Sequence, residues 1–313
     1  MAKLKNSVGA KFEQHPFHLV DPSALPFVVS AIIGVTLCSL AFFFHGAPSD
    51  SILTRAHLSY LFGRPNWAVL WLYVFTLFGM MLVWGAEVTK ESTAQGHHTF
   101  KVQRGLRYGM MLFILSEVMF FFSFFWALFH LSAMATVAVG GIWPPKGIET
   151  LNPWHLPLAN TIILLSSGVC TVWAHRAIIA GRKMDALWGI AAACLYGLLF
   201  SWFQFLEYGL ANFSINDGAY GSVFYMATGF HGVHVIVGTI MLLIAYVRLV
   251  NNQYGRDHHL GFEFAAWYWH FVDVVWLFLY LFLYWWASQL ISNINKCYSR
   301  FAGIYIVSHS NVW

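Results

Sequence analysis

Residues 219–247 read AYGSVFYMATGFHGVHVIVGTIMLLIAYV and contain no Asp, Glu, Lys or Arg. About 20 mostly apolar residues are enough to cross the hydrocarbon core of a bilayer as an α-helix. Because this run is longer than that and carries no formal charge, it predicts a membrane-spanning helix.

Further apolar runs of similar character occur along the rest of the chain. Together with the first run they give seven predicted spans, at 27–44, 67–86, 108–129, 156–175, 186–206, 219–247 and 264–291. The composition agrees, since 59% of the 313 residues are hydrophobic and 10% are charged, whereas soluble domains carry about 25% charged residues. Backbone groups cannot stay unpaired in lipid, and the runs lack the alternation of a membrane β-barrel. The sequence therefore predicts an all-α integral membrane protein with seven transmembrane helices.

Charge and cysteine content exclude several other classes of protein. A net charge of +4 is too small and too dispersed for a nucleic-acid partner. The four cysteines show no C-x-x-C spacing, so neither a disulfide scaffold nor a thiolate metal site is indicated. The N-terminus and the loops near residues 95, 182 and 254 hold twelve Lys and Arg, against five on the other side. This asymmetry places the N-terminus on the cytoplasmic or matrix side.

Several carboxyl groups lie in or beside the predicted spans. Glu117 lies in the middle of a span with no Lys or Arg from 112 to 131, which favours a buried, protonated carboxyl. A proton relay and a neutral tie between two helices are both compatible with it. Asp273 follows His270 by three residues, so the two share a helix face and can form an ion pair. Glu207 and Glu263 lie near span ends, where solvation at the interface is expected.

Histidines are numerous, and five of them fall in or beside spans. They are His130, His175, His231, His234 and His270. His231 and His234 share one helix face at i, i+3, whereas a bis-histidine haem needs ligands from two facing helices. No cofactor or metal is predicted in this chain, and His231, His234, His270 and Asp273 are interpreted as polar helix contacts. Gly229, Gly232 and Gly238 are expected to allow close helix approach.

A second polar group lies on the basic side of the membrane. It comprises Glu91, His97 and His98 in one loop, and Arg248, His258 and His259 near another. Basic and imidazole groups beside helix ends suit a phospholipid phosphate. A merely solvated loop is the alternative at this point.

Long blocks of the sequence carry a family resemblance. They include HPFHLVDPS at 15–23, KESTAQGHH at 90–98, RGLRYGMMLFILSEVMFF at 104–121, GGIWPPKGIETLNPW at 140–154, INDGAYGSVFYMATGFHGVHVIVG at 215–238 and HHLGFEFAAWYWHFVDVVWLFLY at 258–280. In this order, the blocks resemble subunit III of the haem-copper cytochrome c oxidases.

The resemblance implies an architecture of a two-helix arm splayed from a five-helix bundle, with a V-shaped cleft that holds phospholipids. The implied segments are an N-terminal segment at 1–26, the arm at 27–86, a connecting loop at 87–107, the bundle at 108–291 and a C-terminal extension at 292–313. It also implies that Glu117 corresponds to the carboxyl that reacts with hydrophobic carbodiimide. The lipid headgroup contacts of the family map to Glu91, His97, His98, Arg248, His258 and His259.

The implied function is that of a non-catalytic subunit of cytochrome c oxidase (complex IV). Such a subunit supports electron transfer from cytochrome c to dioxygen, coupled to proton pumping, by stabilising the catalytic subunit I and aiding proton uptake or oxygen access. Haem a, haem a3 and copper would lie in partner subunits. The implied location is the mitochondrial inner membrane with the N-terminus in the matrix, and a bacterial plasma membrane is the alternative.

Two other functions are weighed against this one. Subunit III of a quinol oxidase shares the family, and a proton-coupled transporter would use Glu117 and Asp273 as proton sites. A retinal protein is excluded, because no Lys lies between Asn252 and Asn295 to form a Schiff base. The chain also departs from the family pattern. The connection at 45–66 is longer, residues 83–92 (VWGAEVTKES) lack an Arg that relatives often have, and 289–313 extend past the usual end.

Overall fold

The computed structural model describes residues 16–45, 67–134, 141–145 and 147–289. The long connection at 45–66 and the C-terminal extension therefore lie almost wholly outside the described residues. The described part is helical and contains no strand. Its helices are α1 (Leu25–His45), α4 (Trp67–Thr93), α5 (Phe100–Ala133), α6 (Leu156–Ile179), α7 (Lys183–Leu210), α8 (Gly218–Val250) and α9 (Leu260–Leu279), which continues as the π-helix η2 (Tyr280–Trp286).

Six of the seven predicted spans are confirmed as helices long and apolar enough to cross a membrane. They are α4, α5, α6, α7, α8, and α9 with its continuation to Gln289. The first predicted span, 27–44, lies within the helix α1 and is not among these six. The fold class is thus all-helical and multi-pass, and the membrane crossing of α1 stays a prediction.

The helices extend beyond the apolar runs that predicted them. α5 begins at Phe100 rather than at 108. Its first turns hold Lys101, Arg104 and Arg107, which precede the apolar part of the helix. α6 ends at Ile179, and Gly181, two residues later, lies in the left-handed region with φ +74°. The Arg182 amide donates to the Ala177 carbonyl at 2.8 Å. This helix-ending motif reverses the chain tightly, so α7 starts at Lys183.

The chain forms two compact units, residues 1–106 and 107–313, and the boundary falls within α5. In the first unit, α1 packs along α4. α4 has no buried residue in the structure, although it is apolar over most of its length. A helix that is apolar all round is typical of a lipid or protein environment.

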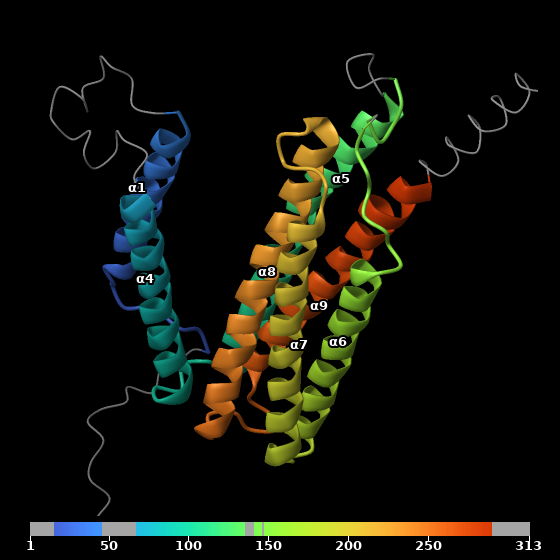
Figure 1. Cartoon of the computed structure of the whole chain (residues 1–313). Coiled ribbons are helices and arrows are strands. Elements are labelled where there is room, and N and C mark those ends of the chain that lie inside the picture. The colour runs from blue at the N-terminus through green and yellow to red at the C-terminus, as the bar shows by residue number, and fades with distance from the viewer. Residues whose placement is uncertain (1–15, 46–66, 135–140, 146, 290–313) are drawn as a thin grey trace, which may run out of the picture. The chain divides into compact units, whose positions relative to one another are not determined.

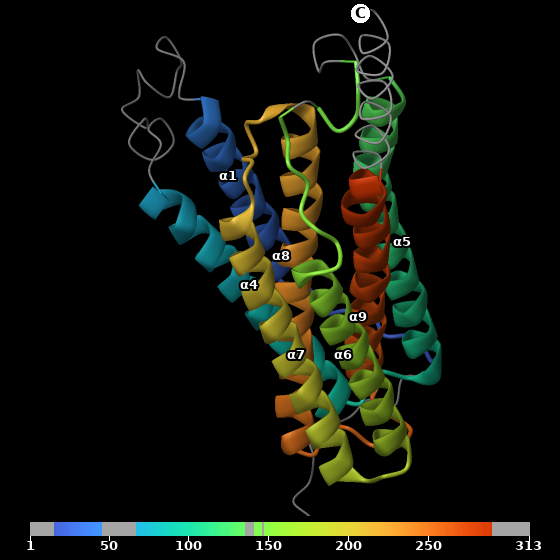
Figure 2. The same cartoon turned by 45° about the vertical axis from the view of Figure 1, so that its right-hand side comes forward.

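In the second unit, α6, α7, α8 and α9 pack side by side, as Figures 1 and 2 show. Small residues allow the close approach of these helices. The Trp269 ring of α9 lies against Gly197 of α7 and Gly238 of α8, where an added Cβ would come within 2.7 and 2.8 Å of ring atoms. Among the three glycines predicted at helix contacts, Gly238 therefore lies at a close contact, whereas an added Cβ at Gly229 or Gly232 would have no neighbour within 4 Å.

α5 contacts the rest of the second unit chiefly through long side chains. Its phenylalanines contact aromatic rings of α8, α9 and η2: Phe120 lies 5.0 Å from Phe230, and Phe129 lies 4.9 Å from Phe282, both edge to face. Such aromatic pairs contribute about 0.5–1.5 kcal/mol beyond the area that they bury. The contact of α5 through Glu117 with His234 lies among these rings.

Candidate functional site

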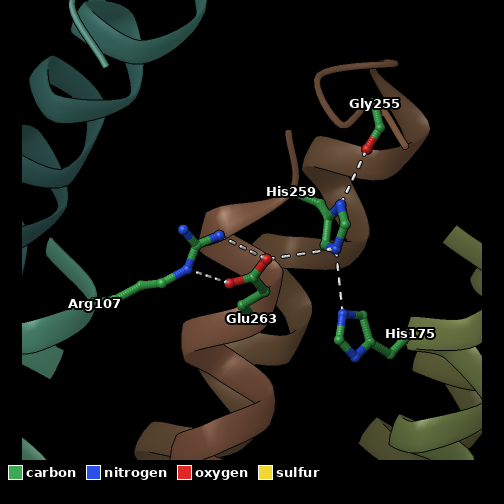
Figure 3. Close-up of polar contacts among 5 residues, drawn as sticks. All are labelled: Arg107, His175, Gly255, His259 and Glu263. Atoms are coloured by element: carbon green, nitrogen blue, oxygen red, sulfur yellow. Dashed lines mark hydrogen bonds and ion pairs between the residues drawn. The ribbon is translucent and has the colours of Figure 1, made fainter. Parts of the chain in front are cut away.

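A bidentate ion pair joins α5 to the start of α9. Arg107 Nε donates to Glu263 Oε2 at 3.0 Å, and Arg107 Nη2 donates to Glu263 Oε1 at 3.1 Å (Figure 3). The two side chains are 31% and 15% exposed. From its position near a span end, Glu263 was expected to have a role at the interface only. It is instead the partner of an arginine that lies 156 residues earlier in the chain.

His259 and His175 extend this pair into a cluster of three helices. Figure 3 shows the His259 ring between Gly255, Glu263 and His175. His259 Nδ1 lies 3.2 Å from the Gly255 carbonyl, which can only accept, so Nδ1 carries a proton. His259 Nε2 lies 3.2 Å from His175 Nε2 on α6 and 3.6 Å from Glu263 Oε1.

This geometry requires a positive centre or a shared proton at the middle of the cluster. With Nδ1 protonated, a neutral His259 directs a lone pair at Nε2 toward Glu263 and His175. The approach of these three groups is favourable in any of three cases. His175 can donate a hydrogen bond to His259 Nε2, His259 can be an imidazolium, or a cation can bind between the three side chains. Ligand atoms of His175, His259 and Glu263 all lie within 4.8 Å of one another. Two imidazoles and a carboxylate suit a borderline divalent cation such as Zn²⁺.

Glu117 has a partner that the sequence did not reveal. Glu117 Oε2 lies 2.9 Å from His234 Nε2, which joins the middle of α5 to the middle of α8. The two side chains are 22% and 13% exposed. His234 Nδ1 lies 2.7 Å from the Phe230 carbonyl and donates to it. A single proton between Glu117 and His234 therefore satisfies both groups.

The other polar residues predicted at helix contacts lie on α8 and α9. His231 is buried, and its Nε2 donates to the Val272 carbonyl at 3.2 Å. His270 Nδ1 lies 3.5 Å from Asp273 Oδ2. The contact expected from their spacing of three residues is therefore present. Asp273 also faces α6, where a Cβ at Gly168 would come within 2.6 Å of the same oxygen.

Three residues of the predicted lipid site lie in the first unit, in and after the last turn of α4. The His97 amide donates to the Glu91 carbonyl at 3.1 Å, and the His97 ring stacks on His18 with centroids 4.4 Å apart. The His98 carbonyl accepts from Gln103 Nε2 at 2.9 Å. The three residues therefore form one ordered turn, which the stack on His18 ties to the segment before α1.

The other three residues lie in the second unit, around the α8–α9 connection. The Arg248 guanidinium lies 4.6 Å above the Tyr254 ring, and its Nε donates to Gln253 Oε1 at 3.1 Å. Burial raises the pKa of the Tyr254 hydroxyl, although Arg248 opposes this. His258 is exposed, whereas His259 is buried and directs both ring nitrogens at the cluster of Figure 3. His259 therefore belongs to the cluster with His175 and Glu263, whereas Arg248 and His258 lie outside that cluster.

The expectation that Glu207 is solvated at the interface is wrong. Its side chain is 1% exposed, and Glu207 Oε1 accepts a hydrogen bond from the Tyr284 hydroxyl at 2.6 Å. Gln204, Tyr284 and Asn160 enclose the carboxyl at the end of the bundle opposite His175. One signal in the sequence could have pointed to this cluster, since Asn160, Gln204 and Tyr284 each lie in a predicted apolar span.

The described part of the chain is all helical, with six helices long and apolar enough to cross a membrane and with polar groups at helix contacts, which defines a multi-pass membrane protein. Residues 15–288 match the family model described as Cytochrome c oxidase subunit III. The chain belongs to this family.

Curated relatives agree along nearly their whole length. Cytochrome c oxidase subunit 3 of Prototheca wickerhamii is 50% identical over 275 residues, which cover 88% of this chain and 99% of the relative. The subunit 3 of Triticum aestivum is 49% identical over 278 residues, covering 88% and 98%. That of Coturnix japonica is 47% identical over 276 residues, covering 88% and 99%. The chain is therefore a complex IV subunit III by family.

Proposed function

We propose that this subunit supports the oxidase without carrying out redox chemistry itself. It stabilises the catalytic subunit I by direct contact, holds structural phospholipids and aids proton uptake or oxygen access. Haem a, haem a3 and copper lie in partner subunits. The family match over residues 15–288 carries this proposal.

The proposed arrangement follows the family in form and location. The arm at 27–86 splays from the bundle at 108–291, and phospholipids fill the cleft between them. The subunit lies in the mitochondrial inner membrane with its N-terminus in the matrix. The excess of Lys and Arg in the N-terminal segment and the loops on that side supports this orientation.

Arg248 is the residue best placed to hold a lipid headgroup. Its Nε donates to Gln253, and its guanidinium lies over the Tyr254 ring. These contacts hold the guanidinium in place and leave its other N–H donors for a phosphate. The Tyr254 hydroxyl stays protonated because burial raises its pKa, so it can donate to the same phosphate. His258 is exposed on the same connection. Glu91, His97 and His98 form the corresponding polar turn after α4.

The test is the phospholipid content of the purified complex. Arg248→Ala is expected to lower co-purified phospholipid and to speed inactivation during turnover, because the headgroup loses its main positive contact. The matched control is Arg182→Ala, which removes an exposed arginine paired with Asp185 at 3.1 Å. Equal lipid content in both variants would refute the headgroup role of Arg248.

Two alternative functions can be distinguished from this one by experiment. A quinol oxidase subunit would co-purify with a complex that oxidises quinol and lacks cytochrome c activity. A proton-coupled transporter would give substrate-dependent proton flux from the isolated chain in vesicles. The 45–50% identity to cytochrome c oxidase subunits favours the first-named function over both.

A further inference from the structure

Four polar side chains are enclosed at one end of the second unit. Asn160 lies in the second turn of α6, Gln204 and Glu207 lie near the end of α7, and Tyr284 lies on η2. Their exposed fractions are between 0% and 5%. The chain itself covers these groups, so a partner subunit cannot reach them unless the helices separate.

The hydrogen bonds in this cluster run toward one oxygen of Glu207. The Tyr284 hydroxyl donates to Glu207 Oε1 at 2.6 Å, and Gln204 Nε2 donates to the same oxygen at 3.4 Å. Asn160 Nδ2 donates to Gln204 Oε1 at 3.5 Å. In this cluster, two buried acceptors have no donor among the described residues, namely Glu207 Oε2 and Asn160 Oδ1.

The groups around the carboxyl are neutral. Its hydrogen-bond partners among the described residues are a tyrosine and a glutamine. The neighbouring tyrosines donate elsewhere, Tyr208 to Thr228 Oγ1 at 2.8 Å and Tyr220 to the Leu283 carbonyl at 3.1 Å. An ionised carboxylate enclosed without a cation costs several kcal/mol. A protonated carboxyl avoids this cost, provided that its hydroxyl finds an acceptor.

Exchanging oxygen and nitrogen in both amides does not remove the need for a proton. Gln204 Oε1 would then face Glu207 Oε1, and two acceptor oxygens repel each other unless a hydrogen lies between them. Either assignment of the amides therefore leads to a Glu207 that carries a proton.

We propose that this cluster is an internal binding site for water built around a neutral Glu207. The carboxylic proton is on Oε2, and this hydroxyl donates a hydrogen bond to a bound water. The water in turn donates to Asn160 Oδ1, either directly or through a second water. A buried water typically makes about three hydrogen bonds to polar groups that would otherwise be unsatisfied. The site therefore takes a small neutral molecule that both donates and accepts, and no proton transfer is needed to fill it.

The π-helix accounts for the position of Tyr284. In η2 the backbone widens over Tyr280–Trp286, and π-helical turns are frequent at functional sites. The Tyr284 hydroxyl contacts Glu207 and Gln204, which both lie on α7. The turn thus ties α9 and α7 together through an uncharged carboxyl.

The test is an infrared spectrum of the purified oxidase complex at neutral pH. A protonated carboxyl absorbs at the C=O stretch of a carboxylic acid, well separated from a carboxylate. Glu207→Gln is expected to remove one such band, and Asn160→Leu is expected to shift it, because the bound water loses its second partner. The matched control is Glu149→Gln, which removes an exposed carboxyl that contacts Asn212 at 3.0 Å and should leave the band in place.

Unchanged carboxylic-acid bands in Glu207→Gln would overturn the proposal, because Glu207 would then be ionised. An unshifted band in Asn160→Leu would overturn the shared water. If Glu207→Gln fails to assemble, Tyr284→Phe serves instead, since losing the donor to Oε1 must shift the same band to higher frequency. A high-resolution map of the complex should show density for water beside Glu207 Oε2, and continuous apolar packing there would contradict the site.

Discussion

Glu117 Oε2 and His234 Nε2 lie 2.9 Å apart between the middles of α5 and α8. Because His234 donates its other ring nitrogen to the Phe230 carbonyl at 2.7 Å, the two facing atoms share one proton. The pair lies among aromatic rings, with Phe121 5.0 Å and Tyr268 6.1 Å from the imidazole. Glu117 is therefore tied to a specific helix contact.

Removing His234 should increase the reaction of Glu117 with a hydrophobic carbodiimide. The reagent adds to a protonated carboxyl, and without the imidazole the carboxyl loses the group that competes for its proton. Labelling of His234→Ala is measured by peptide mass spectrometry against the unaltered protein, with Glu117→Gln as the unreactive control. Glu117→Gln should still assemble, because the amide can donate to His234 Nε2. Unchanged labelling in His234→Ala, or loss of assembly in Glu117→Gln, would refute this account of the pair.

Glu263→Gln should destabilise the subunit by about 2 kcal/mol, because it leaves a partly buried Arg107 with a weaker acceptor. Denaturant unfolding in detergent measures the free energy. Glu87→Gln is the matched control, since Glu87 pairs with Lys90 at 3.6 Å on an exposed surface and should change stability by less than about 1 kcal/mol. Equal effects of the two substitutions would show that the Arg107 pair carries no special stability.

Two glycines of α8 should respond oppositely to alanine. At Gly238 the added methyl group would lie 2.8 Å from the Trp269 ring, which is held by a hydrogen bond to Ser167 Oγ at 2.8 Å. The substitution should cost about 1–3 kcal/mol. At Gly229 nothing lies within 4 Å, so alanine should leave the free energy of unfolding within about 1 kcal/mol, on the stabilising side. Measured in the isolated subunit, a harmless Gly238→Ala would contradict the close packing of α8 on Trp269.

The sequence predicts the helices well, because membrane spans depend on length and apolarity alone. The run at 219–247 lies within α8, Gly218–Val250. The ends are less predictable, since polar residues such as Lys101 and Arg104 continue α5 beyond its apolar part. The first predicted span, 27–44, lies within α1, and the connection that follows it lies outside the described residues.

Contacts between side chains could be predicted only where both partners lie on one helix. The spacing of His270 and Asp273 predicts their contact. No local pattern pairs His175 with His259, which lie 84 residues apart, or Glu117 with His234, which lie 117 apart. Glu207 was misjudged because its position near a span end says nothing of Tyr284, 77 residues later, which covers it.

The most direct test of the central claim is a spectrum and a subunit analysis of the complex purified through this chain from mildly solubilised membranes. The account predicts haem a absorption, two larger partners that carry the haem and copper, and retention of both metals by those partners after this subunit is stripped away. A haem-free chain that purifies alone, or haem and copper that leave with the stripped subunit, would contradict it.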